Sequence, residues 1–246
     1  MGLGNFRYRI IVLICVALVL WQSAKHWSPI ALFGDDSSQS SAAKPQVAQD
    51  LVEDTAVTKP TKLDIQKVLV SVYYEALCPD SRSFVIKQLV PTFKKISDNL
   101  QVELIPYGKA KTIETPTGYE FSCQHGPTEC EANTIHACVI DLVIDPSIQL
   151  DYVTCMIQDN IQPERAMKQC AAKVNLDVAP IEKCWRGTKG KELLAKFGEM
   201  TDDLSPKVTF IPTITLDKDP SNLPEILKNL LKQVCLRLSS PPPGCA

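Results

Sequence analysis

The pattern of apolar and polar residues predicts a strand, a helix and a second strand in close succession. Residues 67–74 are rich in β-branched and aromatic side chains, which is typical of a buried strand. Residues 82–99 then carry apolar side chains at helical spacing, and we expect Pro91 to bend this helix. Residues 100–107 have the pattern of a second strand. The folded part of the chain therefore begins with a β–α–β unit.

A different pattern follows from residue 108 to about residue 200. This stretch is rich in cysteine, and helical patterns dominate it after Asn133, which predicts a mainly helical insertion stapled by disulfides. Strand patterns resume at residues 208–211 and 213–216, on either side of a proline. A last helix is expected over residues 222–236.

Two segments precede this domain, which we place at residues 63–246. Residues 1–24 contain two arginines followed by an apolar run of signal-peptide length, which is short for a membrane span. We interpret them as a cleaved signal peptide or an uncleaved signal anchor. Residues 25–62 are rich in Ser, Asp, Ala, Gln and Lys, which predicts a flexible linker. The domain is thus expected to be secreted or in the lysosomal lumen, with membrane attachment only if the anchor is retained.

Composition and charge exclude some functions. Apolar residues make up 45% of the chain and charged residues 22%, as in ordinary globular proteins. The formal net charge of −2 argues against binding nucleic acid, because phosphate recognition needs a basic surface.

The ten cysteines indicate an oxidising compartment. Cys15 lies in the N-terminal apolar run, and Cys78 is the candidate reactive thiol. Eight cysteines remain, enough for four disulfides, but their connectivity cannot be read from the sequence. These eight are Cys123, Cys130, Cys138, Cys155, Cys170, Cys184, Cys235 and Cys245.

Cys78 stands where the first strand ends and the helix begins. The first turn of a helix offers unpaired N–H groups and the positive end of the helix dipole, and both favour a thiolate. Pro79 suits the first helical position, since its missing N–H costs nothing there, whereas the negative charge of Asp80 modestly opposes the thiolate. A lone cysteine at such a junction can also be a packing residue. A second observation is needed to favour the reactive thiol.

Pro212 supplies that observation. In thioredoxin-type folds, a cis-proline late in the chain faces the active-site cysteine. Ile211 and Pro212 lie between two β-patterned stretches, where a trans proline would interrupt strand pairing. We therefore predict an α/β, thioredoxin-like fold with a disulfide-stapled helical insertion. In this fold Cys78 would attack a disulfide, and Ile211 and Pro212 would bind the extended backbone of the substrate.

Ser81 departs from the usual Cys-x-x-Cys redox pair. A serine can hydrogen-bond the thiolate of Cys78 but cannot attack a mixed disulfide, so release would need an external thiol or a second substrate thiol. Cys78 and Ser81 are the candidate catalytic residues of a thiol reductase or isomerase. The alternative is a redox-inactive binding or chaperone-like protein on the same fold.

Residues 123–138 carry a longer motif. They fit C-Q-H-G-x-x-E-C-x-x-N-x-x-x-x-C, and in this motif the chain resembles the gamma-interferon-inducible lysosomal thiol reductase family. The resemblance implies a thioredoxin-like domain that reduces protein disulfides, often in acid, and suggests a role in immune defence. The family's C-x-x-C redox motif corresponds to positions 78 and 81 of this chain. The resemblance therefore implies that Cys78 is the nucleophile, whereas Ser81 does not carry over as the resolving residue. The chain has no Asn-x-Ser/Thr sequon, so glycan-dependent delivery to lysosomes is not expected.

A zinc site is the rival interpretation of this motif. Its cysteines and its two histidines, His125 and His136, are possible ligands, but the spacing is not that of a zinc finger and an oxidising compartment favours disulfides. We expect no metal and no cofactor. We interpret both histidines as structural or surface residues. The alternative for His125 is that it lies near the active site and adjusts its chemistry. The expected partners are disulfide-containing proteins and an external thiol reductant.

Overall fold

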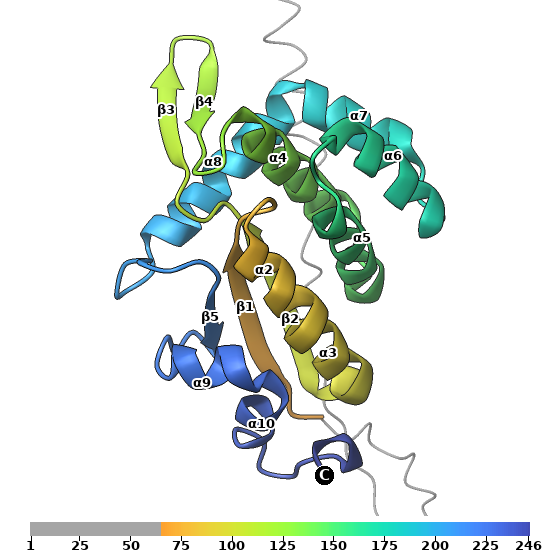
Figure 1. The fold of residues 1–246 in the computed structure, drawn as a ribbon, viewed down its shortest axis with the longest axis vertical. Coiled ribbons are helices and arrows are strands. Elements are labelled where there is room, and N and C mark those ends of the chain that lie inside the picture. Colours follow the sequence, from red (N-terminus) through yellow and green to blue (C-terminus); the bar gives the residue numbers. More distant parts are fainter. Residues whose placement is uncertain (1–64) are drawn as a thin grey trace, which may run out of the picture. The chain divides into compact units, whose positions relative to one another are not determined.

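The computed structural model describes residues 65–246 (Figure 1). The predicted signal segment, the predicted linker and Cys15 lie outside the described residues. Within residues 65–246, no helix is both long and apolar enough to cross a membrane.

A three-stranded sheet in the order β2-β1-β5 forms the centre of the described chain. β1 (Val68–Tyr74) pairs in parallel with β2 (Leu100–Pro106) and antiparallel with β5 (Thr213–Leu216). Val70 lies opposite Val102 on one side and Leu216 on the other. Six of the seven β1 residues are buried, which explains the nearly continuous apolar run in the sequence.

The helix between β1 and β2 is irregular in its middle. It consists of α2 (Pro79–Phe84), a π-helical turn (Val85–Leu89) and α3 (Val90–Ile96). It begins at Pro79, three residues before the predicted start, because proline is well suited to a first helical turn. The π-turn comes just before Pro91, whose ring and missing N–H disfavour a regular helical turn at that place. The helix is thus irregular next to Pro91, where the sequence predicts a bend.

The insertion opens with a hairpin that the sequence pattern does not predict. β3 (Lys111–Thr115) pairs with β4 (Gly118–Ser122) in an antiparallel two-stranded sheet. Neither strand contains a buried residue, so the hairpin contributes little to the apolar pattern of the chain, although Tyr119 and Phe121 alternate with smaller or polar residues in β4. α4 (Pro127–Leu142) then begins six residues before the predicted helical region, again at a proline in its first turn.

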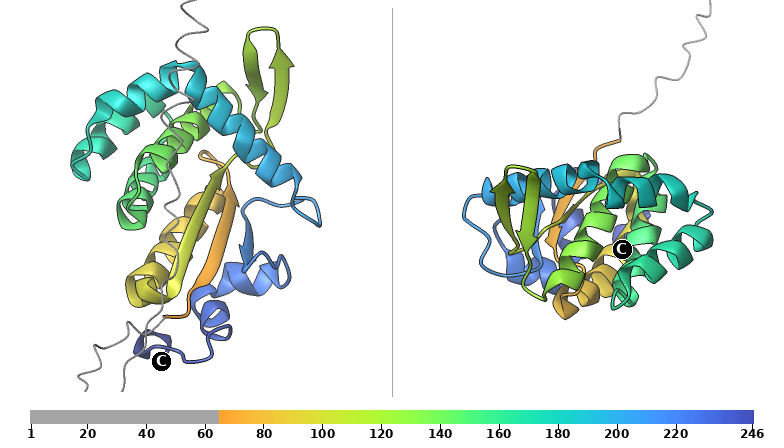
Figure 2. Two further views of the ribbon diagram at one scale, coloured as in Figure 1. Left: turned by 180° about the vertical axis from the view of Figure 1, so that it is seen from behind. Right: turned by 90° about the horizontal axis from the view of Figure 1, so that it is seen from above.

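Four more helices complete the insertion, and the prediction of a mainly helical, disulfide-stapled segment is confirmed. They are α5 (Pro146–Gln158), α6 (Pro163–Lys173), α7 (Val178–Arg186) and α8 (Thr188–Asp202). Figures 1 and 2 show these helices gathered with α4 at the carboxyl ends of β1 and β2, whereas α2 and α3 cover one face of the sheet. The insertion therefore lies over the end of the sheet where Cys78 is found.

The last part of the chain differs from the prediction at two places. Residues 208–211 do not form a strand: 208 and 209 are irregular, and 210 and 211 lie in a bend. The Thr213 hydroxyl donates to the carbonyl of Phe210 (2.6 Å), which holds this bend before β5. The predicted final helix is two helices, α9 (Leu223–Lys228) and α10 (Leu230–Cys235). Asn229 separates them because it leaves helical geometry and caps α10 through its side chain.

All eight cysteines set aside for disulfides are paired. Two bridges join helices within the insertion, one closes the loop before α4, and one ties α10 to the C-terminal tail. The pairs are Cys123–Cys130, Cys138–Cys184, Cys155–Cys170 and Cys235–Cys245. Cys78 is the free cysteine of the described residues. The prediction of one free thiol and four disulfides is confirmed for these residues.

The disulfides should differ in their contribution to stability. Cys138–Cys184 closes a loop with a sequence separation of 46, against 10 for Cys235–Cys245. From the chain entropy of the unfolded state, replacing both cysteines by alanine should cost about 4 kcal/mol for the first pair and about 3 kcal/mol for the second. Urea unfolding of the two double variants measures this. An equal or smaller loss for the first pair would contradict the expectation.

Candidate functional site

Cys78 is positioned by the junction of β1 and α2. It is the N-cap residue of the helix, with Pro79 in the first turn, as predicted. Its backbone N–H donates to the carbonyl of Glu75 (3.3 Å), and its own carbonyl accepts from the N–H of Arg82 (3.0 Å). The side chain is 7% exposed. The fold therefore holds a single thiol at a helix start, just below the surface.

Ile211 and Pro212 lie against this thiol. The Ile211–Pro212 peptide bond is cis, as predicted, and the Sγ of Cys78 donates to the carbonyl of Ile211 (3.8 Å). The two residues are 133 positions apart in the chain. β5 begins directly after Pro212 and pairs with β1, so strand pairing brings the two segments together.

Ser81 is fully buried one turn into α2, and its hydrogen bond differs from the one expected. Its Oγ accepts from the backbone N–H of Glu75 (3.3 Å). Within the described residues no hydrogen bond joins Ser81 to the thiol of Cys78. Ser81 thus connects α2 to the end of β1.

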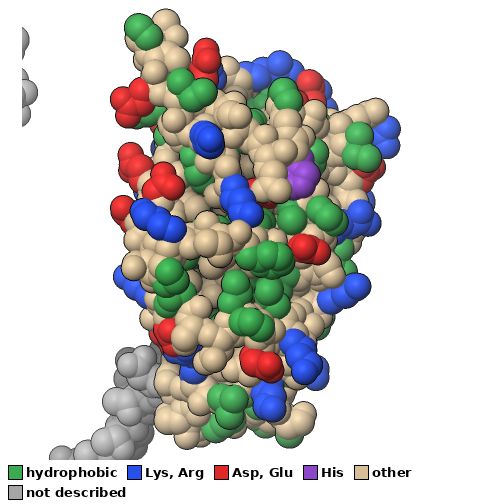
Figure 3. Space-filling view, turned by 60° about the vertical axis from the view of Figure 1, so that its left-hand side comes forward, with side chains coloured by type: hydrophobic (Ala, Val, Ile, Leu, Met, Phe, Trp, Pro, Cys, Tyr) green, Lys and Arg blue, Asp and Glu red, His purple; other side chains and the backbone are tan. Residues whose placement is uncertain are grey.

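A groove of about 260 Å³ lies between α2 and the segment before β5. Phe84 and Leu227 contribute apolar walls, Phe210 and Pro212 form the side nearest β5, and Asp80 adds a charge. Phe210 is 43% exposed, although it is a large apolar residue. Figure 3 shows hydrophobic side chains gathered near the middle of one face of the molecule. Ser83, Lys87 and Gln88 also line the groove, so its surface mixes apolar, polar and charged groups.

The loop between β1 and Cys78 is held by two asparagines of the insertion. Asn133, on α4, accepts from the backbone N–H of Ala76 (2.9 Å), and Asn160 donates to the Ala76 carbonyl (2.9 Å). All three residues are buried. Because an unpaired buried backbone group is costly, these contacts fix the loop firmly. Asn133 belongs to the motif at residues 123–138, which therefore reaches the active-site loop directly.

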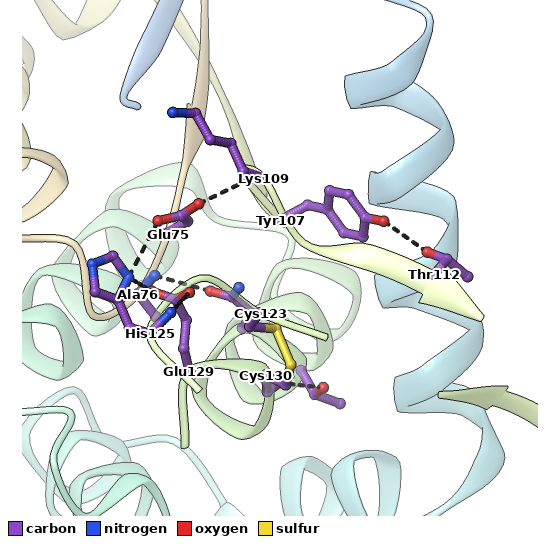
Figure 4. Close-up of a disulfide and its surroundings, with 11 residues drawn as sticks. Glu75, Ala76, Tyr107, Lys109, Thr112, Cys123, His125, Glu129 and Cys130 are labelled. Carbon is purple, nitrogen blue, oxygen red and sulfur yellow. Dashed lines mark hydrogen bonds and ion pairs between the residues drawn. A yellow bond between two sulfur atoms is a disulfide. The ribbon is translucent and has the colours of Figure 1, made fainter. Parts of the chain in front are cut away.

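A cluster of two carboxyl groups and one imidazole lies at the same loop (Figure 4). The Nδ1 of His125 is 2.6 Å from Glu129 Oε2 and 3.3 Å from Glu75 Oε2. Both glutamates are buried, whereas the side chain of His125 is 32% exposed. Burial raises the pKa of Glu75, and the charge of Glu129 raises it further, although a hydrogen bond from the Lys109 backbone opposes this.

Sequence reasoning assigned no role to either glutamate. Glu129 was visible only as a fixed position of the motif, and Glu75 as an acidic residue after an apolar strand. Neither signal indicates a contact between residues so far apart in the chain. For His125, the alternative of a place beside the active-site loop agrees with the structure.

His136 is a structural residue, as predicted. It is fully buried, and its Nδ1 shares a hydrogen bond with the hydroxyl of Tyr74 (2.9 Å). Burial lowers the pKa of His136 to about 3, so the ring is neutral at physiological pH.

The predicted zinc alternative does not fit the structure. Cys123, Cys130 and Cys138 are all in disulfides, so they offer no thiolate. The possible donor atoms of Glu75, His125 and Glu129 lie within 4.8 Å of one another. However, the 2.6 Å separation of His125 and Glu129 is that of a direct hydrogen bond.

Comparison with known proteins identifies the family. The model of the family described as gamma interferon inducible lysosomal thiol reductase (GILT) matches residues 69–174. A gamma-interferon-inducible lysosomal thiol reductase-like protein of Anopheles gambiae is 34% identical over 195 residues, which cover 73% of this chain and 80% of that protein. The chain belongs to the gamma-interferon-inducible lysosomal thiol reductase family.

A second relative agrees with this family, and a solved structure agrees with the fold. GILT-like protein 1 of Drosophila melanogaster is 31% identical over 204 residues, covering 74% of this chain and 80% of that protein. The crystal structure of Chlamydia trachomatis DsbA has a TM-score of 0.50 at 14% identity, covering 72% of this chain and 91% of that one. The fold is thioredoxin-like, as predicted. This member of the thiol reductase family is a disulfide oxidoreductase.

The state of the cysteines can be tested directly. When the native protein is alkylated without reduction and digested, we expect the label on Cys78 and none on the eight bridged cysteines. Mass spectrometry of the peptides measures this, with a reduced, denatured sample as the control in which every cysteine is labelled. A disulfide-bonded Cys78 would contradict the described site.

Proposed function

We propose that Cys78 is the nucleophile with which this chain reduces or isomerises protein disulfides. Its thiolate attacks one sulfur of a substrate disulfide, the substrate S–S bond breaks, and the other substrate sulfur leaves as a thiolate. A mixed disulfide between Cys78 and the substrate remains. The observation that carries this proposal is the free thiol at a helix start, in contact with the Ile211 carbonyl.

The resolving thiol comes from outside the site in this proposal. Ser81 stands where a second cysteine would attack the mixed disulfide, and the eight other cysteines of the described chain are bridged. In reduction, an external thiol attacks the Cys78 sulfur of the mixed disulfide and the substrate leaves as its second thiolate; a second external thiol then attacks the bridge between Cys78 and the first one, and Cys78 leaves as a thiolate. Two electrons thus pass from the two external thiols, which end as a disulfide, to the substrate. In isomerisation, a second substrate thiol attacks the substrate sulfur of the mixed disulfide, Cys78 leaves as a thiolate, and no net electrons are transferred.

The substrate lies in the groove beside α2. An extended peptide placed there can contact Phe210 and Pro212 on one side of the groove and Asp80 and Ser83 of α2 on the other. A wall that mixes apolar, polar and charged side chains suits unfolded segments of varied sequence better than one compact ligand. Protein disulfides in exposed or unfolded segments are therefore the substrates we propose.

The secretory or lysosomal lumen is the compartment we infer. One of the relatives named above is a lysosomal thiol reductase-like protein, and the four disulfides fit an oxidising or luminal environment. A role in immune defence is proposed from the family's name alone.

The nucleophile is tested by Cys78→Ala. With insulin as substrate and an external thiol, we expect the variant to fall to the rate of the external thiol alone, because it has no sulfur to form the mixed disulfide. Turbidity of the released insulin chain at pH 4.5 to 7 measures the rate. Ser97→Ala, an exposed change beyond α3, is the control and should retain full activity. Equal rates for Cys78→Ala and wild type would reject the proposal.

Ser81→Cys tests the missing resolving thiol. We expect turnover to rise about tenfold or more at limiting external thiol, because an intramolecular thiol replaces a bimolecular collision. The wild type should accumulate a mixed disulfide with its substrate, visible by non-reducing electrophoresis after acid quenching. Unchanged turnover in Ser81→Cys would show that release from the mixed disulfide is not limiting.

A further inference from the structure

Glu75 and Glu129 are two buried carboxyl groups that lie close together beside the active-site loop. Their side chains are 1% and 0% exposed, and both oxygens named above approach the same imidazole nitrogen of His125. Full ionisation would give two negative charges and at most one positive charge in this cluster. A buried carboxylate without a compensating charge is costly, so the cluster is expected to retain an additional proton.

Backbone groups hold both carboxyl groups in place. The N–H of Lys109 donates to Glu75 Oε1 (2.8 Å), and the N–H of His125 donates to Glu129 Oε1 (3.0 Å). The second oxygen of each group is left facing His125, and Glu75 Oε2 has no hydrogen-bond partner among the described residues. This is an arrangement that a shared proton satisfies. The charged groups that act on Glu75 are Glu129, His125 and Lys109.

Glu75 also connects the cluster to both active-site residues. Its carbonyl accepts from the N–H of Cys78 (3.3 Å), and its own N–H donates to Ser81 Oγ (3.3 Å). Gly108 packs so closely on Glu75 that an added Cβ would lie 2.2 Å from the glutamate side chain. The carboxyl group therefore has little freedom, and the residue that carries it is bonded through its backbone to Cys78 and Ser81.

We propose that Glu75, His125 and Glu129 act on Cys78 as positioning residues. They share protons, so the net charge of the cluster beside the Cys78 loop changes with pH. At lower pH the cluster takes up a proton and loses its excess negative charge, which favours retention of the Cys78 thiolate. At higher pH the excess charge returns and opposes the thiolate. The inference rests on the proposed role of Cys78.

The test is the pH dependence of Cys78 alkylation by iodoacetamide between pH 4 and 8. A thiol that titrates alone loses about tenfold in rate per pH unit below its midpoint. We expect the wild type to lose distinctly less per unit, because the cluster takes up its proton in the same range. Glu75→Gln, which retains an oxygen for the Lys109 N–H, should restore the full slope and react roughly threefold faster at pH 7.

Glu129→Gln should also restore the full slope, since it removes the second carboxyl group of the cluster. Asn133→Ala is the matched control, because it loosens the same loop without removing an ionisable group. It should change the overall rate and retain the shallow wild-type slope. Thermal unfolding at each pH identifies the range in which every variant is folded, and slopes are compared there.

Three outcomes would overturn the inference. The first is a wild-type alkylation rate that falls tenfold per pH unit. The second is a shallower pH dependence that remains in both Glu75→Gln and Glu129→Gln. The third is a wild-type pH profile that becomes the same as that of Glu75→Gln after EDTA treatment. The last would assign the cluster to a bound cation in place of a proton. Alkylation does not require turnover, so a failure here is distinguishable from a failure of Cys78 as the nucleophile, which the insulin assay decides.

Discussion

The structure of the site depends on how three residues between β1 and Cys78 are held. Asn133 and Asn160 bind both backbone groups of Ala76, while the carboxyl group of Glu75 is held by the Lys109 N–H and faces His125. These contacts come from the insertion and from the turn after β2. A short loop with this many buried polar partners has few alternative conformations, so the thiol that follows it is placed with precision.

This dependence gives the insertion a physical role. A thioredoxin-like sheet with its first helix can present a cysteine at a helix start without further elements. Here the helices from α4 to α8 form a second apolar core beyond the carboxyl end of the sheet, and disulfides join α4 to α7 and α5 to α6. The motif at residues 123–138 uses this rigid support to reach the active-site loop. Two of its three cysteines, Cys123 and Cys130, close the turn that carries His125.

Ser81 changes the chemistry of the site without disturbing its architecture. The helix begins at Pro79 directly after Cys78, and the serine hydroxyl connects α2 to Glu75. The sulfur of Cys78 instead has the Ile211 carbonyl as its hydrogen-bond partner. A site of this kind can form a mixed disulfide but depends on another thiol to resolve it. Its turnover rate therefore depends on the concentration of thiols around the protein.

Local sequence determined the elements of the core and the special status of Cys78. The run before Cys78 is apolar because β1 is buried, and Pro79 marks the helix start, so both were visible in the residues themselves. Cysteine parity likewise indicated one free thiol, although not which cysteines pair. Elements with weak local signals were predicted poorly: the exposed hairpin β3–β4, the turn before Pro212 and the break at Asn229.

Only the tertiary structure decided what surrounds the thiol. The hydrogen bond of Ser81, the contact of Cys78 with Ile211 and the cluster of Glu75, His125 and Glu129 all join residues from different elements. Hydrophobic periodicity records which face of an element is buried, but it carries no information on which buried polar groups meet. Those contacts follow from the packing of the insertion against the end of the sheet, and this packing is a property of the whole chain.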